Sequence, residues 1–176
     1  MAFSIRPATR EDCRDLVRMV RELAEHFKFT DCATQADLEQ NGFTEEPFFS
    51  AFIAEVPEER KSSAGYTKVG MAVYFLSYSL LTNRRVIYMQ LLFVMPEFRG
   101  TGVGKALLKK VAQEGVAAGC RTLKFFMRHW DKPLLDFYVS QGCHDLTSEL
   151  GVHVMSCDGD ALQRLGAAPE PPPAGK

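Results

Sequence analysis

Three glycines at alternate positions constrain this chain more than any other feature. Gly100, Gly102 and Gly104 stand between an apolar run at residues 86–94 and a segment in which apolar residues alternate with lysines. The apolar run predicts a strand, and the segment after the glycines predicts an amphipathic helix. Glycines at such a join let backbone N–H groups approach an anion, and the helix N-terminus adds partial positive charge. We therefore expect a turn that binds a phosphate or pyrophosphate.

Composition narrows the class of protein. The chain has 176 residues, 46% of them hydrophobic, which fits one compact domain. Its 21 Lys and Arg nearly cancel its 22 Asp and Glu, which argues against binding to nucleic acid or to an anionic membrane. No apolar run reaches the ~20 residues that span a bilayer, and the N-terminus lacks the apolar core of a signal peptide. Five scattered cysteines without a CxxC pair indicate buried, reduced thiols, and nothing suggests a metal. We expect a cytoplasmic protein.

The apolar periodicity predicts a mixed series of strands and helices. Strands are expected at residues 3–8, 48–56, 69–80, 86–94, 122–126 and 151–157. Helices are expected at residues 13–27, 34–42, 103–119 and 134–141, and capping-box patterns, Thr9 with Asp12 and Thr34 with Asp37, open the first two. This order predicts an α/β fold with one parallel crossover at the centre of its sheet. We expect a single domain over residues 1–166 and a disordered, proline-rich tail over residues 167–176.

Known phosphate-binding patterns can be compared with the glycine turn. The P-loop pattern fails because its first glycine would fall on Arg99 and its hydroxyl on Ala106. The dinucleotide fingerprint fails because its last glycine would fall on Lys105 or Leu107. A third pattern is Arg or Gln, two arbitrary residues, Gly, one residue, then Gly or Ala, and residues 99–104 match every fixed position. A flexible turn with chance glycines is the alternative that the residues alone leave open.

The third pattern is the acetyl-CoA signature of the GNAT acetyltransferases, and the chain resembles that family over nearly its whole length. The segments that carry the resemblance are IRPATREDC, GFTEEPFF, AEVPEE, LFVMPEFRGTGVG, DFYVSQG and DLTSELG. Together they resemble the spermidine/spermine (diamine) and thialysine acetyltransferase branch. The resemblance implies a GNAT fold, with a mixed, mostly antiparallel central sheet that is splayed at a bulge and flanked by helices.

The resemblance also implies where acetyl-CoA, the donor substrate, would bind. The strand ending at Leu92, Phe93 and Val94 would leave its parallel neighbour and offer free amides to the pantetheine arm and the thioester carbonyl. From the residues alone, this segment is equally well explained as core. The amides that would hold the pyrophosphate are those of Arg99, Gly100, Thr101, Gly102, Val103, Gly104 and Lys105. A further CoA-contacting segment is matched by Asp131, Lys132, Pro133 and Leu134, with Asp131 in place of the family's asparagine.

Tyr138 is the proton donor that the resemblance implies for the departing thiolate. A phenol with a pKa of about 10 suits a thiol leaving group of similar basicity. Without the resemblance, an aromatic side chain packed beside Phe137 is the simpler interpretation. The sequence does not identify which residue acts as the general base, and the candidates by analogy are Glu25, His26, His129 and Glu149.

The acceptor side departs from the branch that the chain resembles. Polyamine-acetylating relatives carry Glu–Asp where this chain has Gln90 and Leu91. Other substrate-side acids are replaced here by Phe27, Ser79 and Leu150. A primary amine has a pKa of ~10, arrives charged, and must lose a proton before it attacks, so each lost acid removes a partner for it. We expect Gln90, Phe27 and Leu150 to contact the acceptor, and spermine and spermidine to be poor substrates.

These observations favour an enzyme that acetylates the primary amine of a small molecule less cationic than a polyamine. An acceptor carboxylate could meet Arg84 or Arg85. Two alternatives stay open: a CoA-binding protein that has lost catalysis and acts through protein interaction, and a protein or peptide N-acetyltransferase. The resemblance implies a homodimer whose C-terminal strands exchange contacts, to which the exposed-looking Phe48, Phe49 and Phe52 add weak support.

Overall fold

A computed structural model describes residues 2–167 of the chain, which divide into two compact units. The first unit ends at Phe126 and the second begins at Met127. Apart from Ala167, the tail expected over residues 167–176 lies outside the described residues. The expectation of a single domain over residues 1–166 stays a prediction.

The first unit is built on one five-stranded sheet with the strand order β1-β2-β3-β4-β5. The strands are β1 (Ser4–Pro7), β2 (Ser50–Glu55), β3 (Lys68–Ser79), β4 (Arg84–Val94) and β5 (Cys120–Phe125). The first three pairings are antiparallel, whereas β4 and β5 run parallel. A parallel pair needs a crossover, and helix α3 (Val103–Ala117) supplies it. The predicted α/β fold with a mixed, mostly antiparallel sheet is confirmed. The expected position of the crossover is wrong: it joins the last two strands at the edge of the sheet and not at its centre, because no strand of the described residues pairs beyond β5.

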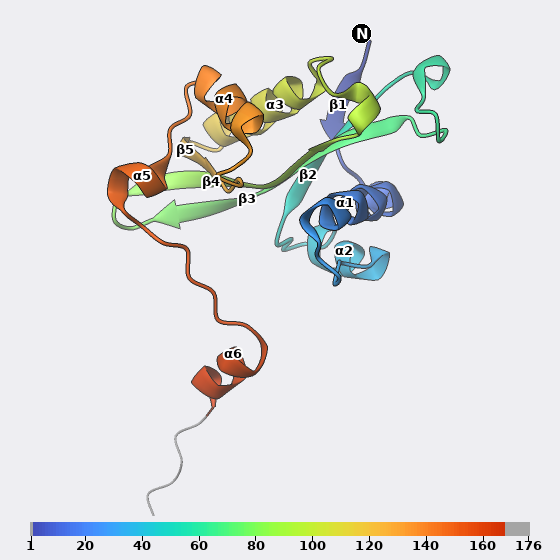
Figure 1. Cartoon of the computed structure of the whole chain (residues 1–176). Helices are drawn as coiled ribbons and strands as arrows, with labels where there is room; N and C mark the ends of the chain where they lie inside the picture. Colours follow the sequence, from blue (N-terminus) through green and yellow to red (C-terminus); the bar gives the residue numbers. More distant parts are fainter. Residues whose placement is uncertain (1, 168–176) are drawn as a thin grey trace, which may run out of the picture. The chain divides into compact units, whose positions relative to one another are not determined.

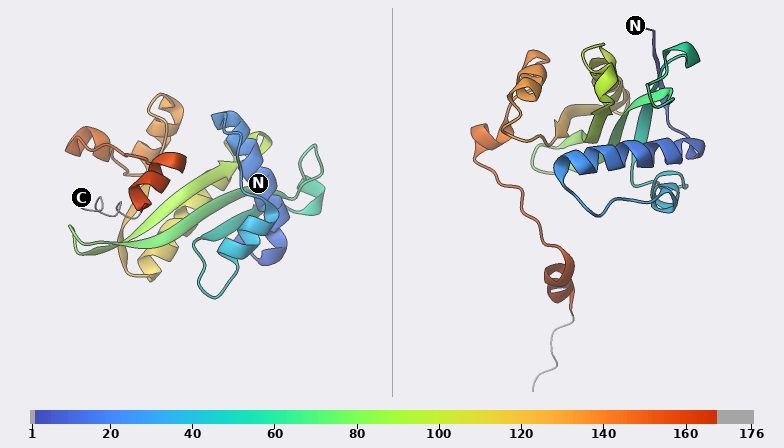
Figure 2. Two further views of the ribbon diagram at one scale, coloured as in Figure 1. Left: turned by 90° about the horizontal axis from the view of Figure 1, so that it is seen from below. Right: turned by 45° about the vertical axis from the view of Figure 1, so that its right-hand side comes forward.

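Helices cover both faces of this sheet. Helices α1 (Cys13–Phe27) and α2 (Gln35–Gly42) lie on one face and α3 on the other, as Figures 1 and 2 show. The two capping boxes expected from the sequence are present, Thr9 with Asp12 before α1 and Thr34 with Asp37 at the start of α2. Each joins a Thr hydroxyl and an Asp carboxylate to backbone N–H groups that would otherwise lack partners, so local chemistry sets where these segments begin.

The two faces are packed in different ways. On the α1 face, Leu16 and Met19 join a buried cluster with side chains of β2, β3 and β4. On the α3 face, glycines bring helix and sheet close together. A methyl group at Gly115 would lie 2.7 Å from Ile87 Cγ2, and one at Gly70 would lie 3.1 Å from Leu107 Cδ1. Helix α3 is therefore held tightly along β4.

A buried carboxylate ties the start of α1 to two strands. Asp12 is only 1% exposed and lies in the short 3-10 turn Arg10–Asp12. Arg6 of β1 donates to both of its oxygens at 2.7 and 2.9 Å, and the Lys68 ammonium of β3 lies 2.9 Å away. The pKa of Asp12 is lowered well below its ordinary value, mainly by the hydrogen bonds from Arg6.

The apolar surface expected around residues 48–52 is only partly present. Phe48 is 79% exposed, whereas Phe52 is 2% exposed and stacks on Tyr74 with ring centroids 5.3 Å apart. The expectation for Phe52 is wrong because β2 lies inside the sheet and is covered on both faces. Phe49 is half-buried and packs against the core.

The second unit contains α4 (Lys132–Ser140), α5 (Leu146–Leu150) and α6 (Gly159–Gly166). The expected strand at residues 151–157 is wrong, because this segment has no regular secondary structure. Its alternating Val152 and Val154 resemble a strand pattern, but they are 47% and 73% exposed. A strand needs a paired neighbour to form, and alternation alone does not supply one.

All five cysteines are free, but only Cys13 is buried and Cys157 is exposed, so the expectation of uniformly buried thiols is wrong. Within residues 2–167, none of the helices combines the length and apolarity that a bilayer crossing requires.

Candidate active site

Strand β4 has an extra residue at Gln90. Val73 of β3 pairs with Leu91 and the next residue, Tyr74, pairs with Met89, so Gln90 has no pairing partner on β3. The side chain of Gln90 is exposed. The parallel pairing of β4 with β5 ends at the same place, with Met89 opposite Phe125. A bulge bends its strand and ends local pairing. The sheet therefore opens between β4 and β5 just beyond Met89, which is the splay expected from the sequence.

The opened edge of β4 carries backbone groups that face away from β3. Met95 donates its N–H to the Val69 carbonyl at 2.8 Å, and hydrogen-bonded and non-bonded pairs alternate along an antiparallel ladder. By this alternation Leu92 and Val94 direct their N–H and C=O groups toward the side that β5 has left. In agreement, the Val94 carbonyl accepts a hydrogen bond from Arg99 Nε at 3.1 Å.

The glycine turn follows directly. The 3-10 turn Pro96–Phe98 anchors it, because Phe98 is buried in the core and its carbonyl accepts the Thr101 hydroxyl at 2.6 Å. Gly100 and Gly102 have φ values of +73° and +93°, a region that L side chains rarely adopt. A methyl group at either glycine would meet nothing within 4 Å among the described residues. The backbone of the turn is therefore open to a ligand.

Helix α3 begins at this turn, with Gly102 as its N-cap. The first N–H groups of a helix have no intrahelical acceptor, and the helix dipole adds partial positive charge at that end. The exposed Arg99 and Lys105 flank the turn with formal positive charge. Open amides, positive charge and a neighbouring unpaired strand edge together fit an anionic group with an extended polar arm.

A contact that the sequence did not predict fixes the turn to a distant loop. The Glu97 carboxylate accepts hydrogen bonds from the Ser63 N–H at 2.9 Å and the Ser63 hydroxyl at 2.8 Å. Ser63 lies in the loop between β2 and β3, and no periodicity or motif links these two positions. These bonds lower the pKa of Glu97, which favours its charged form.

The remaining donor-side candidates lie in the second unit. The Asp131 carboxylate accepts the Leu134 N–H at 3.1 Å and so caps α4, while Lys132 pairs with Asp136. This capping explains an aspartate in place of asparagine, since either side chain is a good N-cap. Tyr138 is 5% exposed, and burial raises its pKa to about 12, with smaller contributions from Cys143 and Asp131. Its phenol is therefore protonated at neutral pH.

The match to known families decides which protein class uses this arrangement. Residues 16–143 match the family described as Acetyltransferase (GNAT) family, which is well over half of the chain. The chain belongs to the GNAT family. It is an acetyl-CoA-dependent N-acetyltransferase related to thialysine N-acetyltransferases and to proteins resembling spermidine/spermine acetyltransferases. The family resemblance read from the sequence is confirmed.

Two relatives illustrate the relation. The GNAT chain is 36% identical over 168 residues to thialysine N-epsilon-acetyltransferase of Bos taurus, which covers 94% of this chain and 98% of that protein. It is 33% identical over 162 residues to spermidine/spermine N(1)-acetyltransferase-like protein 1 of Homo sapiens, covering 91% of this chain and 23% of that protein. Among solved structures, an integron cassette protein from the mobile metagenome of V. cholerae has a TM-score of 0.75 at 23% identity, covering 96% of this chain and 99% of that one. At that identity, the likeness shows the fold alone.

The acceptor-side candidates of the GNAT chain are spread over both units. In the first unit, Gln90 lies exposed at the bulge, and Phe27 ends α1 in an edge-to-face contact with His26. In the second, Leu150 ends α5 and is 66% exposed. Of the candidate bases, Glu149 lies 3.6 Å from His144, whereas His129 packs edge-on against Trp130. Arg85 is already engaged, because its guanidinium donates to the Ala118 carbonyl at 2.9 Å.

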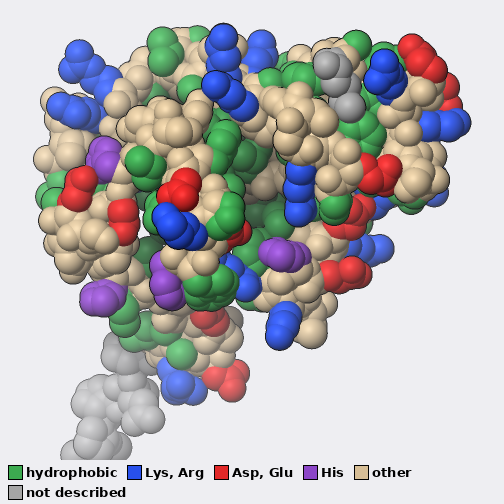
Figure 3. Space-filling view, turned by 45° about the horizontal axis from the view of Figure 1, so that its top comes forward, with side chains coloured by type: hydrophobic (Ala, Val, Ile, Leu, Met, Phe, Trp, Pro, Cys, Tyr) green, Lys and Arg blue, Asp and Glu red, His purple; other side chains and the backbone are tan. Residues whose placement is uncertain are grey.

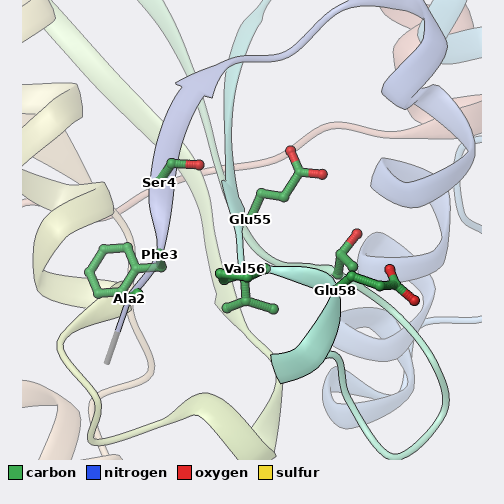
Figure 4. A pocket seen from close by; sticks show the side chains of 8 residues that line it. Ala2, Phe3, Ser4, Glu55, Val56 and Glu58 are labelled. Carbon is green, nitrogen blue, oxygen red and sulfur yellow. The ribbon is translucent and has the colours of Figure 1, made fainter.

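A pocket of about 550 Å³ lies elsewhere on the first unit. It is lined by residues at the ends of β1 and β2 and in the segment that follows β2, among them Phe3, Glu55 and Glu58 (Figure 4). None of its lining residues belongs to β4 or the glycine turn, and Glu55 is paired with Arg6 at 3.2 Å. We therefore place the candidate active site at the opened edge of β4 and not in this pocket. On the face drawn in Figure 3, basic and acidic side chains lie among each other, as the near-zero net charge suggests.

Proposed function

We propose that this GNAT protein transfers the acetyl group of acetyl-CoA to the primary amine of a small molecule. The observation that carries the proposal is the open edge of β4 beyond Met89, which leads directly into the turn with Gly100 and Gly102. An extended polar arm can bind to free strand amides, and a pyrophosphate joined to it can bind to an open turn at a helix N-terminus directly after that strand.

Each part of the donor has a proposed partner in the chain. The amides of residues 99–105 would hold the pyrophosphate, and the Leu92–Val94 segment would pair with the pantetheine arm. The open space at Gly100 and Gly102 supports this fit, because a side chain there would stand where the anion must approach. A free amide of the β4 edge would donate a hydrogen bond to the thioester carbonyl, whose oxygen gains negative charge during attack. We also propose contacts from residues 131–134, on the resemblance alone.

The chemistry needs two proton movements. Acetyl-CoA supplies the acetyl group as a thioester; the amine nitrogen forms the new C–N bond and the C–S bond breaks. The amine loses a proton and the departing thiolate gains one. We propose Tyr138 as the donor to the thiolate. Its raised pKa, about 12, keeps the proton in place at neutral pH.

The acceptor is proposed to differ from a polyamine. Gln90 stands exposed at the bulge with an uncharged side chain, and Leu91 packs against the core behind it. Neither can neutralise an ammonium group as a carboxylate does, and exposed charge pairs contribute up to about 1 kcal/mol each. The relatives named after thialysine and spermidine/spermine therefore indicate the reaction, while the acceptor of this chain is less cationic.

The proposal can be tested in two steps. Isothermal titration should show CoA binding, and acetyl-CoA with a panel of small amines should release free thiol. Efficient turnover of spermine at micromolar concentration would contradict the acceptor proposal. CoA binding without thiol release for any small amine would favour the CoA-binding alternative. Thiol release with a peptide only would favour the peptide-acetylating alternative.

We further propose a homodimer. The 79% exposed Phe48 and the exposed apolar residues of segment 151–157 support an additional buried surface. Light scattering that returns the mass of one chain, 19.7 kDa, would reject it.

A further inference from the structure

Three aromatic rings lie in a row across the strands next to the bulge. Phe75 of β3 and Tyr88 of β4 lie parallel, with centroids 5.3 Å apart and planes 7° apart. Phe126, directly after β5, continues the row, with its centroid 6.1 Å from that of Tyr88 and its plane tilted by 33°. We call Phe75, Tyr88 and Phe126 the aromatic platform. The reaction steps proposed above do not use it.

The aromatic platform lies on the face of the sheet opposite α3. Helix α3 follows β4 along its length: Gly104 packs near Val94, Gly115 against Ile87, and Ala118 accepts a hydrogen bond from Arg85. Side chains alternate between the faces of a strand, so Tyr88, next to Ile87, points to the other face. Figure 2 shows α3 on one side of the sheet and α1 on the other.

The core beneath α1 does not cover this aromatic surface. The buried cluster on that face includes Val73, and Leu91 packs against it, but its members do not extend to Phe75 or Tyr88. Both of these rings are half-buried, and Phe126 is 69% exposed. Within the first unit, this partly exposed aromatic surface thus begins on β4 just before the bulge at Gln90, where the free edge of that strand begins.

We propose that the aromatic platform holds the body of the acceptor, and that this acceptor is an amine carrying an aryl or alkyl group. This inference rests on the proposed function, which puts the thioester at the free edge of β4. Helix α3 blocks one face of β4 there, so an acceptor has to approach from the other face. On that face the surface next to the edge is aromatic.

Charge on this face selects against polycations. In the parallel pairing, Lys124 of β5 stands beside Tyr88 and on the same face. Aromatic faces attract single cations weakly at exposed sites, but an ammonium beside them repels a chain of further positive charges. An acceptor with a flat or apolar group and one amine gains contact with the rings. Its single positive charge is lost before the reaction, when the ammonium group gives up its proton.

The test compares acceptors at saturating acetyl-CoA. We expect kcat/KM for phenethylamine and hexylamine to exceed that for spermidine by about tenfold or more, since a pocket of matching polarity discriminates at this level. Phe126→Ala and Tyr88→Leu should raise the KM for phenethylamine and leave the Kd for CoA unchanged. Tyr78→Ala, which changes a 52% exposed tyrosine outside the platform, is the matched control and should alter neither.

The possible outcomes distinguish failure of this inference from failure of the proposed function on which it rests. The inference would be overturned if spermidine were turned over better than both apolar amines, or if folded platform variants kept an unchanged KM. Either result would leave the proposed enzymatic function standing. CoA binding without turnover of any apolar amine would overturn it as well. Absence of CoA binding in the unmodified chain would overturn the proposed function itself. Thermal unfolding of each variant checks that it is folded. If Tyr88→Leu does not fold, Phe126→Ala still tests the inference, because Phe126 is exposed and its loss should not disturb the core.

Discussion

The Glu97 carboxylate accepts both the backbone N–H and the hydroxyl of Ser63, two residues that are 34 positions apart. Glu97 directly precedes the turn with the acetyl-CoA signature, so this contact joins that turn to the loop between β2 and β3. The loop is itself ordered: Tyr66 donates its N–H to the Ser62 hydroxyl, and the Arg18 guanidinium of α1 lies 3.9 Å from the centre of the Tyr66 ring. The position of the turn thus depends on a chain of contacts reaching α1.

Replacing Glu97 should weaken CoA binding without unfolding the protein. We expect Glu97→Ala to raise the Kd for CoA several-fold, with Ser63→Ala intermediate because it keeps the backbone N–H. The pKa of Glu97 is lowered by the Ser63 bonds, so the contact is present above the ordinary Glu value and is lost as pH falls through the lowered one. Titration calorimetry measures the Kd, with Glu59→Ala as the control for an exposed carboxylate. Equal Kd values for Glu97→Ala and the unmodified chain would refute the positioning role.

The glycines of the turn should differ in their tolerance of alanine. Gly100→Ala and Gly102→Ala place a side chain at positive φ, which costs roughly 1–2 kcal/mol. They should lower both the free energy of unfolding and the affinity for CoA. Gly104→Ala is the matched control, because its methyl would sit at an ordinary 3.6 Å from Val94 Cγ2 and alanine favours a helix. Urea denaturation of the three variants checks this order, and similar losses for all three would contradict it.

Packing of α3 on β4 should be sensitive to a single methyl group. Gly115→Ala would press against Ile87, and overpacking of this kind costs about 1–3 kcal/mol. Ile87→Ala removes the obstructing Cγ2, so the double variant should be less destabilised than the sum of the two single changes. A double-mutant cycle by chemical denaturation measures the coupling. Simple additivity would show that the helix shifts to absorb the methyl.

Asp12 should make stability depend on pH in the acid range. Its pKa is lowered chiefly by hydrogen bonds from Arg6, so its contribution is present above the unfolded value of ~3.9 and is lost as pH falls through the lowered folded value. We expect Asp12→Asn to destabilise the protein by about 2 kcal/mol at pH 7, typical of hydrogen bonds to a charged group. The difference from the unmodified chain should shrink below about pH 4. A constant difference across that range would contradict the assignment.

Tyr138→Phe should reduce kcat about 100-fold or more while leaving the Kd for CoA unchanged, because only the proton donor is lost. With a pKa raised to about 12, the phenol stays protonated over the range in which the acceptor amine becomes neutral. The rate should therefore rise toward pH 10 without a falling limb from this group. Tyr78→Phe serves as the control. Unchanged kcat in Tyr138→Phe would remove this residue from the proposed mechanism.

Elements fixed by neighbouring residues could be predicted from the sequence. The capping boxes at Thr9 and Thr34 involve partners three positions away, and both are found. The positive-φ glycines and the splay of β4 followed from one short motif and the family that carries it. The alternation of apolar residues and lysines after the glycines predicted the amphipathic helix α3.

Features that depend on distant partners could not be predicted. Segment 151–157 has the alternation of a strand but no paired neighbour among the described residues, and Phe52 is buried by elements far away in sequence. The Ser63–Glu97 contact joins two loops, where no periodicity applies. The aromatic platform needs the register of three strands, which places Phe75 opposite Tyr88 and Phe126 beyond β5.

The donor site that we propose depends on an irregularity in the sheet. Gln90 is one residue too many for a regular ladder, and its presence coincides with the loss of pairing between β4 and β5. Deleting Gln90 would repair the ladder with β3 without shifting Leu91–Val94 from their partners. Such a shortened protein is expected to be at least as stable. If β5 then paired further along β4, the edge proposed to bind the pantetheine arm would be occupied, and CoA binding should be lost.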